Sequence, residues 1–106
     1  MKKIIKGTRY DTEKASVIGY ASNGENVTDF SHWCVTLYKT PRSGRYFLHG
    51  QGGPMTRWAQ SRGQNEWVGG EDIIPLKNRQ EAFEWAQANL CAEEVEKEFY
   101  DLIEDA

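Results

Sequence analysis

Apolar and polar residues alternate most regularly in the middle of the chain. Residues 32–40 and 45–49 are rich in aromatic and β-branched side chains, and the segment between them, Pro41–Gly44, is typical of a four-residue hairpin loop. With Thr40 opposite Arg45, alternate residues of the two strands share one face of the hairpin. We expect the core face to carry Trp33, Val35, Leu37, Tyr46 and Leu48, with Leu37 opposite Leu48.

The same register predicts the composition of the other face of this hairpin. It places Tyr38 opposite Phe47, with polar side chains on either side of the pair. A shift of one residue would exchange the two faces, so the assignment depends on the loop geometry. The second face is expected to carry His32, Cys34, Thr36, Tyr38, Arg45, Phe47 and His49.

Shorter patterns predict the elements before the hairpin. Residues 2–5 and 8–10 surround a two-residue loop with glycine, which predicts a second, tighter hairpin. Asp11 or Thr12 then stands where an N-cap would begin a short helix ending near Tyr20.

The glycine-rich region after the central hairpin, residues 50–70, is expected to hold a short helix over residues 55–61. Residues 71–76 predict a further strand, and Pro75 marks it as an edge strand or a strand end. Helical periodicity begins at Asn78, which with Glu81 resembles a capping box. One apolar stripe consists of Phe83, Ala86 and Leu90, and a second of Val95, Phe99, Leu102 and Ile103, with a joint at Cys91-Ala92.

These patterns predict one domain over residues 1–106, of the α+β class. We expect a small antiparallel sheet of about four to five strands around the hairpin of residues 32–49, a short N-terminal helix and two C-terminal helices. The chain is long enough to bury roughly 65% of its unfolded surface. With 39% hydrophobic and 12% aromatic residues, it is too apolar for a disordered chain.

The chain is expected to be cytoplasmic. No apolar run approaches the length of a membrane span, so no membrane partner is expected. The first residues, Met1–Lys6, are basic but lack the apolar segment of a secretory signal.

Charge is unevenly distributed along the sequence. Residues 1–62 hold ten Lys/Arg and four Asp/Glu, a net +6, whereas residues 63–106 hold three Lys/Arg and twelve Asp/Glu, a net −9. Solvated helix faces explain much of the acidic half. The alternative is a two-poled molecule, with one pole suited to basic protein surfaces and the other to phosphates.

The glycine-rich segment Leu48–Trp58 raises the question of a phosphate loop. It lacks the Lys of a Walker loop and the third Gly of a dinucleotide fingerprint, so a sharp turn at a strand end is favoured. If the segment did bind an anion, Arg57 would be its charge partner.

No set of residues predicts catalysis, and no cofactor is expected. There is no G-x-S-x-G motif, and a pair of Cys34 with a histidine lacks an orienting partner. The two cysteines are expected to be buried free thiols. A zinc site is a disfavoured alternative because the spacings match no zinc pattern; its ligands would be His32, Cys34, His49 and Cys91.

Five sequence segments, in the order in which they occur along the chain, resemble a group of small uncharacterised bacterial proteins found on phages, plasmids and conjugative elements. These segments are Lys3–Thr12, Leu37–Thr40, Gly44–Gly53, Gly69–Leu76 and Glu81–Ala86, which together extend over nearly the whole chain. The resemblance implies a small protein that binds and inhibits host defence machinery, such as CRISPR or restriction systems.

Two functions follow for comparison. The first is a non-enzymatic inhibitor whose acidic C-terminal helix meets a basic, nucleic-acid-binding surface of a protein partner through Glu93, Glu94, Glu96, Glu98 and Asp101. The alternative is direct binding of single-stranded nucleic acid, with aromatic rings stacking on bases and cations meeting phosphates. Its residues would be Tyr38, Lys39, Arg42, Arg45, Phe47 and Arg57.

Overall fold

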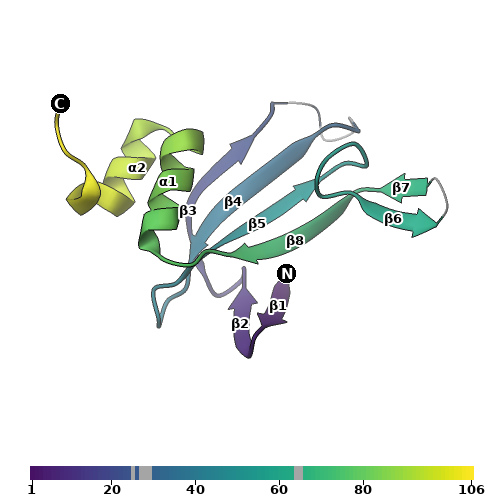
Figure 1. Ribbon diagram of the computed structural model, residues 1–106, viewed down its shortest axis with the longest axis horizontal. Helices are drawn as coiled ribbons and strands as arrows, with labels where there is room; N and C mark the ends of the chain where they lie inside the picture. The colour runs from purple at the N-terminus through teal and green to yellow at the C-terminus, as the bar shows by residue number, and fades with distance from the viewer. Residues whose placement is uncertain (25, 27–29, 64–65) are drawn as a thin grey trace.

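Four antiparallel strands form the central sheet of the computed structural model, which describes residues 1–24, 26, 30–63 and 66–106. In spatial order these strands are β3 (Ser16–Ser22), β4 (Trp33–Lys39), β5 (Tyr46–Gly52) and β8 (Gly70–Pro75). Two small hairpins project from it (Figure 1): β1 (Lys2–Ile5) with β2 (Thr8–Asp11), and β6 (Gln60–Gly63) with β7 (Glu66–Val68).

The helices follow the last strand and lie beside one another at one end of the sheet (Figure 1). They are α1 (Arg79–Asn89) and α2 (Ala92–Phe99), followed by the short 3₁₀ helix η1 (Tyr100–Leu102). Asn78 caps α1, because its side-chain oxygen accepts a hydrogen bond from the Glu81 backbone N–H at 2.9 Å. The α+β class, the antiparallel sheet and the two C-terminal helices are therefore confirmed.

The predicted register of the central hairpin is also confirmed. Leu37 lies opposite Leu48, and Tyr38 lies opposite Phe47. The Thr40 N–H donates to the Arg45 carbonyl oxygen at 2.8 Å, which closes the loop at the expected pair. β8 is an edge strand that ends at Pro75, where a missing N–H costs no ladder hydrogen bond.

The predicted N-terminal helix is wrong, since the structure has strand β3 in its place. The Asp11 carboxylate does accept the Glu13 N–H at 3.0 Å, as an N-cap would, but the chain makes only a turn there, and the Thr12 hydroxyl bonds to Met1. The β-branched pair Val17-Ile18 then favours an extended chain that pairs with β4.

The short helix predicted over residues 55–61 is wrong for a related reason. The Thr56 hydroxyl donates to the Gly53 carbonyl oxygen at 2.8 Å and accepts the Trp58 N–H at 3.2 Å, so a turn forms there. β6 begins at Gln60, directly after this turn.

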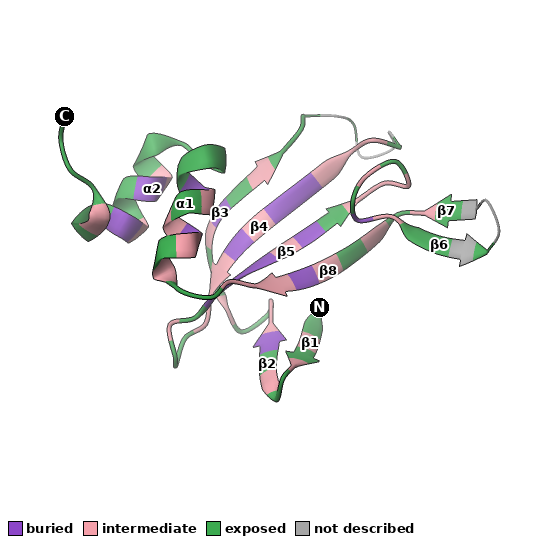
Figure 2. Cartoon of the chain, viewed as in Figure 1, coloured by how far each residue is buried: buried purple, intermediate pink, exposed green. Residues whose placement is uncertain are grey.

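Buried residues gather along β4 and β5 (Figure 2), and their side chains form a core on each face of this pair. We call them the helix face, which packs against α1 and α2, and the hairpin face, which packs against β2. On the helix face, residues of β4 and β5 meet Ala82, Ala86, Val95 and Phe99. On the hairpin face, Phe47 and Ile73 meet Tyr10.

Two glycines near the end of β5 make room for side chains of the turn that follows it. Trp58 is 7% exposed, and a Cβ atom at Gly50 would overlap its indole ring. Gly52 is filled in the same way by Thr56. Packing therefore explains the glycines of Leu48–Trp58, because they let the turn after β5 fold back onto that strand.

We predict that Gly50→Ala lowers the free energy of unfolding by about 1–3 kcal/mol, because the added methyl group overlaps the Trp58 ring. Urea unfolding gives the measurement. In a Trp58→Leu background the same substitution should cost less, since the smaller side chain leaves room. An equal loss in both backgrounds would contradict the steric explanation.

Candidate functional site

The acidic residues of α2 divide into those that fix the helix layer and those that face solvent. Glu98 belongs to the first group: its Oε1 accepts from Lys39 Nζ at 3.0 Å and from the Tyr46 hydroxyl at 2.5 Å. Both partners lie on the sheet, so one carboxylate joins α2 to β4 and β5. Among the described residues, no buried side-chain nitrogen or oxygen lacks a hydrogen-bond partner.

These contacts change the protonation of both partners. The hydrogen bond to Glu98 raises the pKa of Lys39. Burial and then the Glu98 hydrogen bond raise the pKa of Tyr46. In both cases the neighbouring carboxylate favours the protonated form of Lys39 or Tyr46.

Asp101 also belongs to the residues that fix the helices. Arg79 of α1 donates to both of its carboxylate oxygens at 2.6 Å, and to the Glu98 carbonyl oxygen at 2.8 Å. The Arg79 guanidinium also lies 5.5 Å from the centre of the Phe99 ring. Arg79 therefore clamps the C-terminal end of α2, where a cation is favoured by the helix dipole.

An open groove on the outer side of the helices is lined by two other carboxylates. The groove has a volume of about 580 Å³, and we call it the acidic groove. Glu96 and Glu104 line it, while Glu93 is exposed on the same helix and Glu94 is half-buried beside Cys91. Its apolar lining consists of Phe83, Leu90, Ala92, Val95, Leu102 and Ile103.

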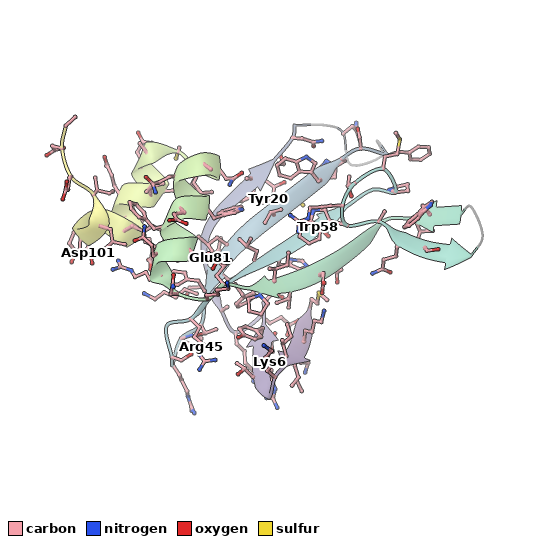
Figure 3. All side chains as sticks on the ribbon, viewed as in Figure 1. Lys6, Tyr20, Arg45, Trp58, Glu81 and Asp101 are labelled. Carbon is pink, nitrogen blue, oxygen red and sulfur yellow. The ribbon has the colours of Figure 1, made fainter. Side chains whose placement is uncertain are left out.

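Basic side chains gather elsewhere in the molecule. Figure 3 shows Asp101 at the helical end, and Lys6 and Arg45 near one another on the β1–β2 hairpin and the β4–β5 turn. Arg45 Nη1 donates to the Thr8 hydroxyl at 3.3 Å, which ties these two segments together. The two halves of the sequence nevertheless meet elsewhere, because Lys3 pairs with Asp72 at 2.5 Å and Lys39 pairs with Glu98 at 3.0 Å.

The predicted nucleic-acid surface is not assembled as expected. Phe47 is 0% exposed, with Tyr38 stacked on it at 5.2 Å and Tyr10 packed edge-on at 5.5 Å. Lys39 projects to the helix face in its ion pair with Glu98, and Arg57 lies 4.9 Å from the Trp58 ring. Of the six predicted residues, Arg42 and Arg45 at the turn and Arg57 after β5 are exposed. Nucleic-acid binding there stays a prediction without its stacking residues.

The disfavoured zinc ligands do not converge either. Cys34 is buried in β4, whereas Cys91 is exposed at the joint between the helices, which corrects the expectation that both thiols are buried. Both cysteines are free, as expected. His49 lies 3.3 Å from Glu71, and within the described part of the chain no three His, Cys, Asp or Glu side chains are grouped to hold a metal ion.

A second hollow, which sequence reasoning missed, lies on the helix face between α1 and the turn after β5. We call it the tryptophan pocket, and its volume is about 560 Å³. Val35 and Leu48 of the sheet line it together with Trp33, Met55, Arg57, Trp58 and Trp85. The sequence signal was the number of tryptophans, four in 106 residues, but three of them are distant along the chain.

Removing the Glu98 carboxylate should loosen the helix layer. We expect Glu98→Ala to lower the free energy of unfolding by about 2 kcal/mol, because the buried Tyr46 hydroxyl loses its partner. The matched control, Glu96→Ala, alters an exposed carboxylate of the same helix and should stay within about 0.5 kcal/mol of wild type. Equal effects in urea unfolding would show that Glu98 does not join the layers.

Acid should weaken the Arg79–Asp101 clamp. The hydrogen bond from Arg79 lowers the pKa of Asp101, so its stabilisation is complete above the unfolded pKa of about 3.9 and is lost as pH falls through the lower folded pKa. We therefore expect unfolding free energy to fall less between about pH 5 and pH 2 in Asp101→Asn than in wild type. Asp105→Asn, at an exposed position, should keep the wild-type pH dependence.

Neither α1 nor α2 has the length and apolar composition needed to cross a bilayer, and the described residues contain no other α-helix. No protein-family model, curated protein or solved structure matches this chain.

Proposed function

We propose that this chain is a cytoplasmic, non-enzymatic interaction module of a mobile element that inhibits a host or defence nucleoprotein complex of the CRISPR or restriction type. The observation that carries the proposal is the acidic groove. Its apolar floor and its uncommitted carboxylates fit a partner surface that is basic at the rim and apolar at the centre.

The division of labour among the acidic side chains supports this role. Glu98 and Asp101 hold the helices on the sheet, so they position the groove and do not meet the partner first. Glu96 and Glu104 line the groove, and Glu93 and Glu94 stand in the first turn of the same helix. A fixed array of carboxylates can occupy the places on a basic surface that nucleic-acid phosphates would otherwise take.

The apolar floor supplies what charge alone does not. Exposed ion pairs contribute little affinity and are screened by salt, whereas buried apolar contacts give a complex its lifetime. Ile103 is 38% exposed and Leu102 is half-buried, so both can lose further surface to a partner. Inhibition by competition with nucleic acid needs no chemical step.

The proposal is tested by affinity purification of the tagged chain from a host that carries a CRISPR or restriction system, together with a phage-protection assay. We expect a nucleic-acid-binding subunit to be recovered, an oligonucleotide to compete for it, and phage protection to fall. Recovery of no specific partner, with phage protection intact, would refute the inhibitor function.

A charge-reversal pair locates the contact surface. We predict that Glu96→Lys weakens binding to the recovered subunit at least about tenfold, which corresponds to about 1.4 kcal/mol. Glu13→Lys makes the same charge change at an exposed position beside β2 and should bind like wild type. Equal weakening by both variants in a titration would mean that net charge, and not the acidic groove, controls the association.

A further inference from the structure

The tryptophan pocket has the size and composition of a small-molecule site. Its volume of about 560 Å³ lies within the range usual for ligand pockets, and its walls are mostly apolar and aromatic. Trp33 comes from β4, Trp58 from the turn after β5 and Trp85 from α1. Three indole rings from separate segments favour a flat ring system as the occupant.

The neutral polar side chains of the pocket are already used by the chain. The Asn23 side-chain oxygen accepts the Trp33 backbone N–H at 3.3 Å, and its side-chain nitrogen donates to the Ser31 carbonyl oxygen at 2.8 Å. The Thr56 hydroxyl bonds to Gly53 and Trp58, and the Asn89 amide nitrogen donates to the Trp85 carbonyl oxygen at 2.8 Å. These groups shape the pocket and do not offer much to a ligand.

Arg57 differs from them in charge and in its free donors. It is the only charged side chain among the described residues that line the pocket, and within the described chain it forms no ion pair. Its guanidinium lies 4.9 Å from the centre of the Trp58 ring, so a ring held fast in the core orients it. A planar guanidinium at a pocket rim matches a carboxylate or a phosphate.

We propose that the tryptophan pocket binds a small aromatic anion, with its ring among Trp33, Trp58 and Trp85 and its carboxylate or phosphate on Arg57. This site lies apart from the acidic groove: no residue lines both. The charge at the rim is also opposite in sign, so the two hollows select different ligands. A carboxylate ligand and a phosphate ligand would share the same features: a flat ring and an anionic group joined to it by a short linker.

The test uses two matched pairs of probes that differ in charge: 2-naphthylacetate with 2-naphthylacetamide, and AMP with adenosine. The readout is the set of tryptophan side-chain N–H signals in the nitrogen-15 NMR spectrum of the full chain. We expect the signals of Trp33, Trp58 and Trp85 to shift, while that of Trp67, which is 58% exposed on β7, stays fixed. Preference for the first or the second pair distinguishes a carboxylate ligand from a nucleotide.

Arg57→Gln tests the source of the charge preference. In wild type we expect the anionic member of the preferred pair to bind at least tenfold more tightly than the neutral one, a factor of about ten being a typical effect of one charge-assisted contact. Arg57→Gln should remove that difference and leave the neutral probe unchanged. Arg42→Gln, at the exposed hairpin turn, and Glu96→Lys, in the acidic groove, should keep it.

The proposal is overturned by any of three results. These are equal binding of the charged and neutral probes to wild type, an unchanged preference in Arg57→Gln, and shifts that include Trp67 or that are absent at about millimolar probe, the weak limit for a specific small ligand. A thermal melt of Arg57→Gln near that of wild type shows that the variant is folded. The side chain is exposed, so this substitution leaves the core intact.

Discussion

Burial of the β4–β5 pair on both faces is the constraint from which the rest of the structure follows. Strands that alternate apolar side chains toward two covered faces need a layer on each side. Here Leu37 and Leu48 require the helices, while Phe47 and Ile73 require the β1–β2 hairpin. An open face would leave these apolar side chains in water at a cost of about 1.5–3 kcal/mol for each large side chain.

The helices cover only part of the helix face, and this incomplete cover creates the tryptophan pocket. The turn after β5 covers another part by placing Trp58 over Gly50. Val35 and Leu48 lie between the two covers and form part of the pocket lining. The glycines that resembled a phosphate loop therefore contribute to a hollow through packing, and the cation beside them is held at its rim.

The helix layer is attached by a few polar contacts of high geometric quality in addition to its apolar stripe. Glu98 meets two side chains of the sheet, and Arg79 meets Asp101 with both ends of its planar group. Charged side chains that are paired in this way hold the helices in place on the sheet. Glu96 and Glu104 line the acidic groove, which is the surface proposed to meet a partner.

The sequence by itself determined the local pairings: the register of the central hairpin, the first hairpin, the Pro75 edge strand, the cap at Asn78 and the joint between the helices. Each depends on neighbours in sequence, where turn chemistry and side-chain period are decisive. The acidic character of α2 was likewise evident, since charge needs no contacts to be counted.

Only the tertiary structure decided what those elements do. β3 is a strand because β4 offers it a partner, which outweighs two weak capping signals. Phe47 cannot stack on a nucleobase because Tyr10, 37 residues earlier in the chain, covers that face of the sheet. Within the described residues, Glu98 is bound to the sheet while Glu96 is free, and three tryptophans that are distant in sequence share a pocket. Long-range packing decides which side chains meet, and the local sequence pattern does not encode these contacts.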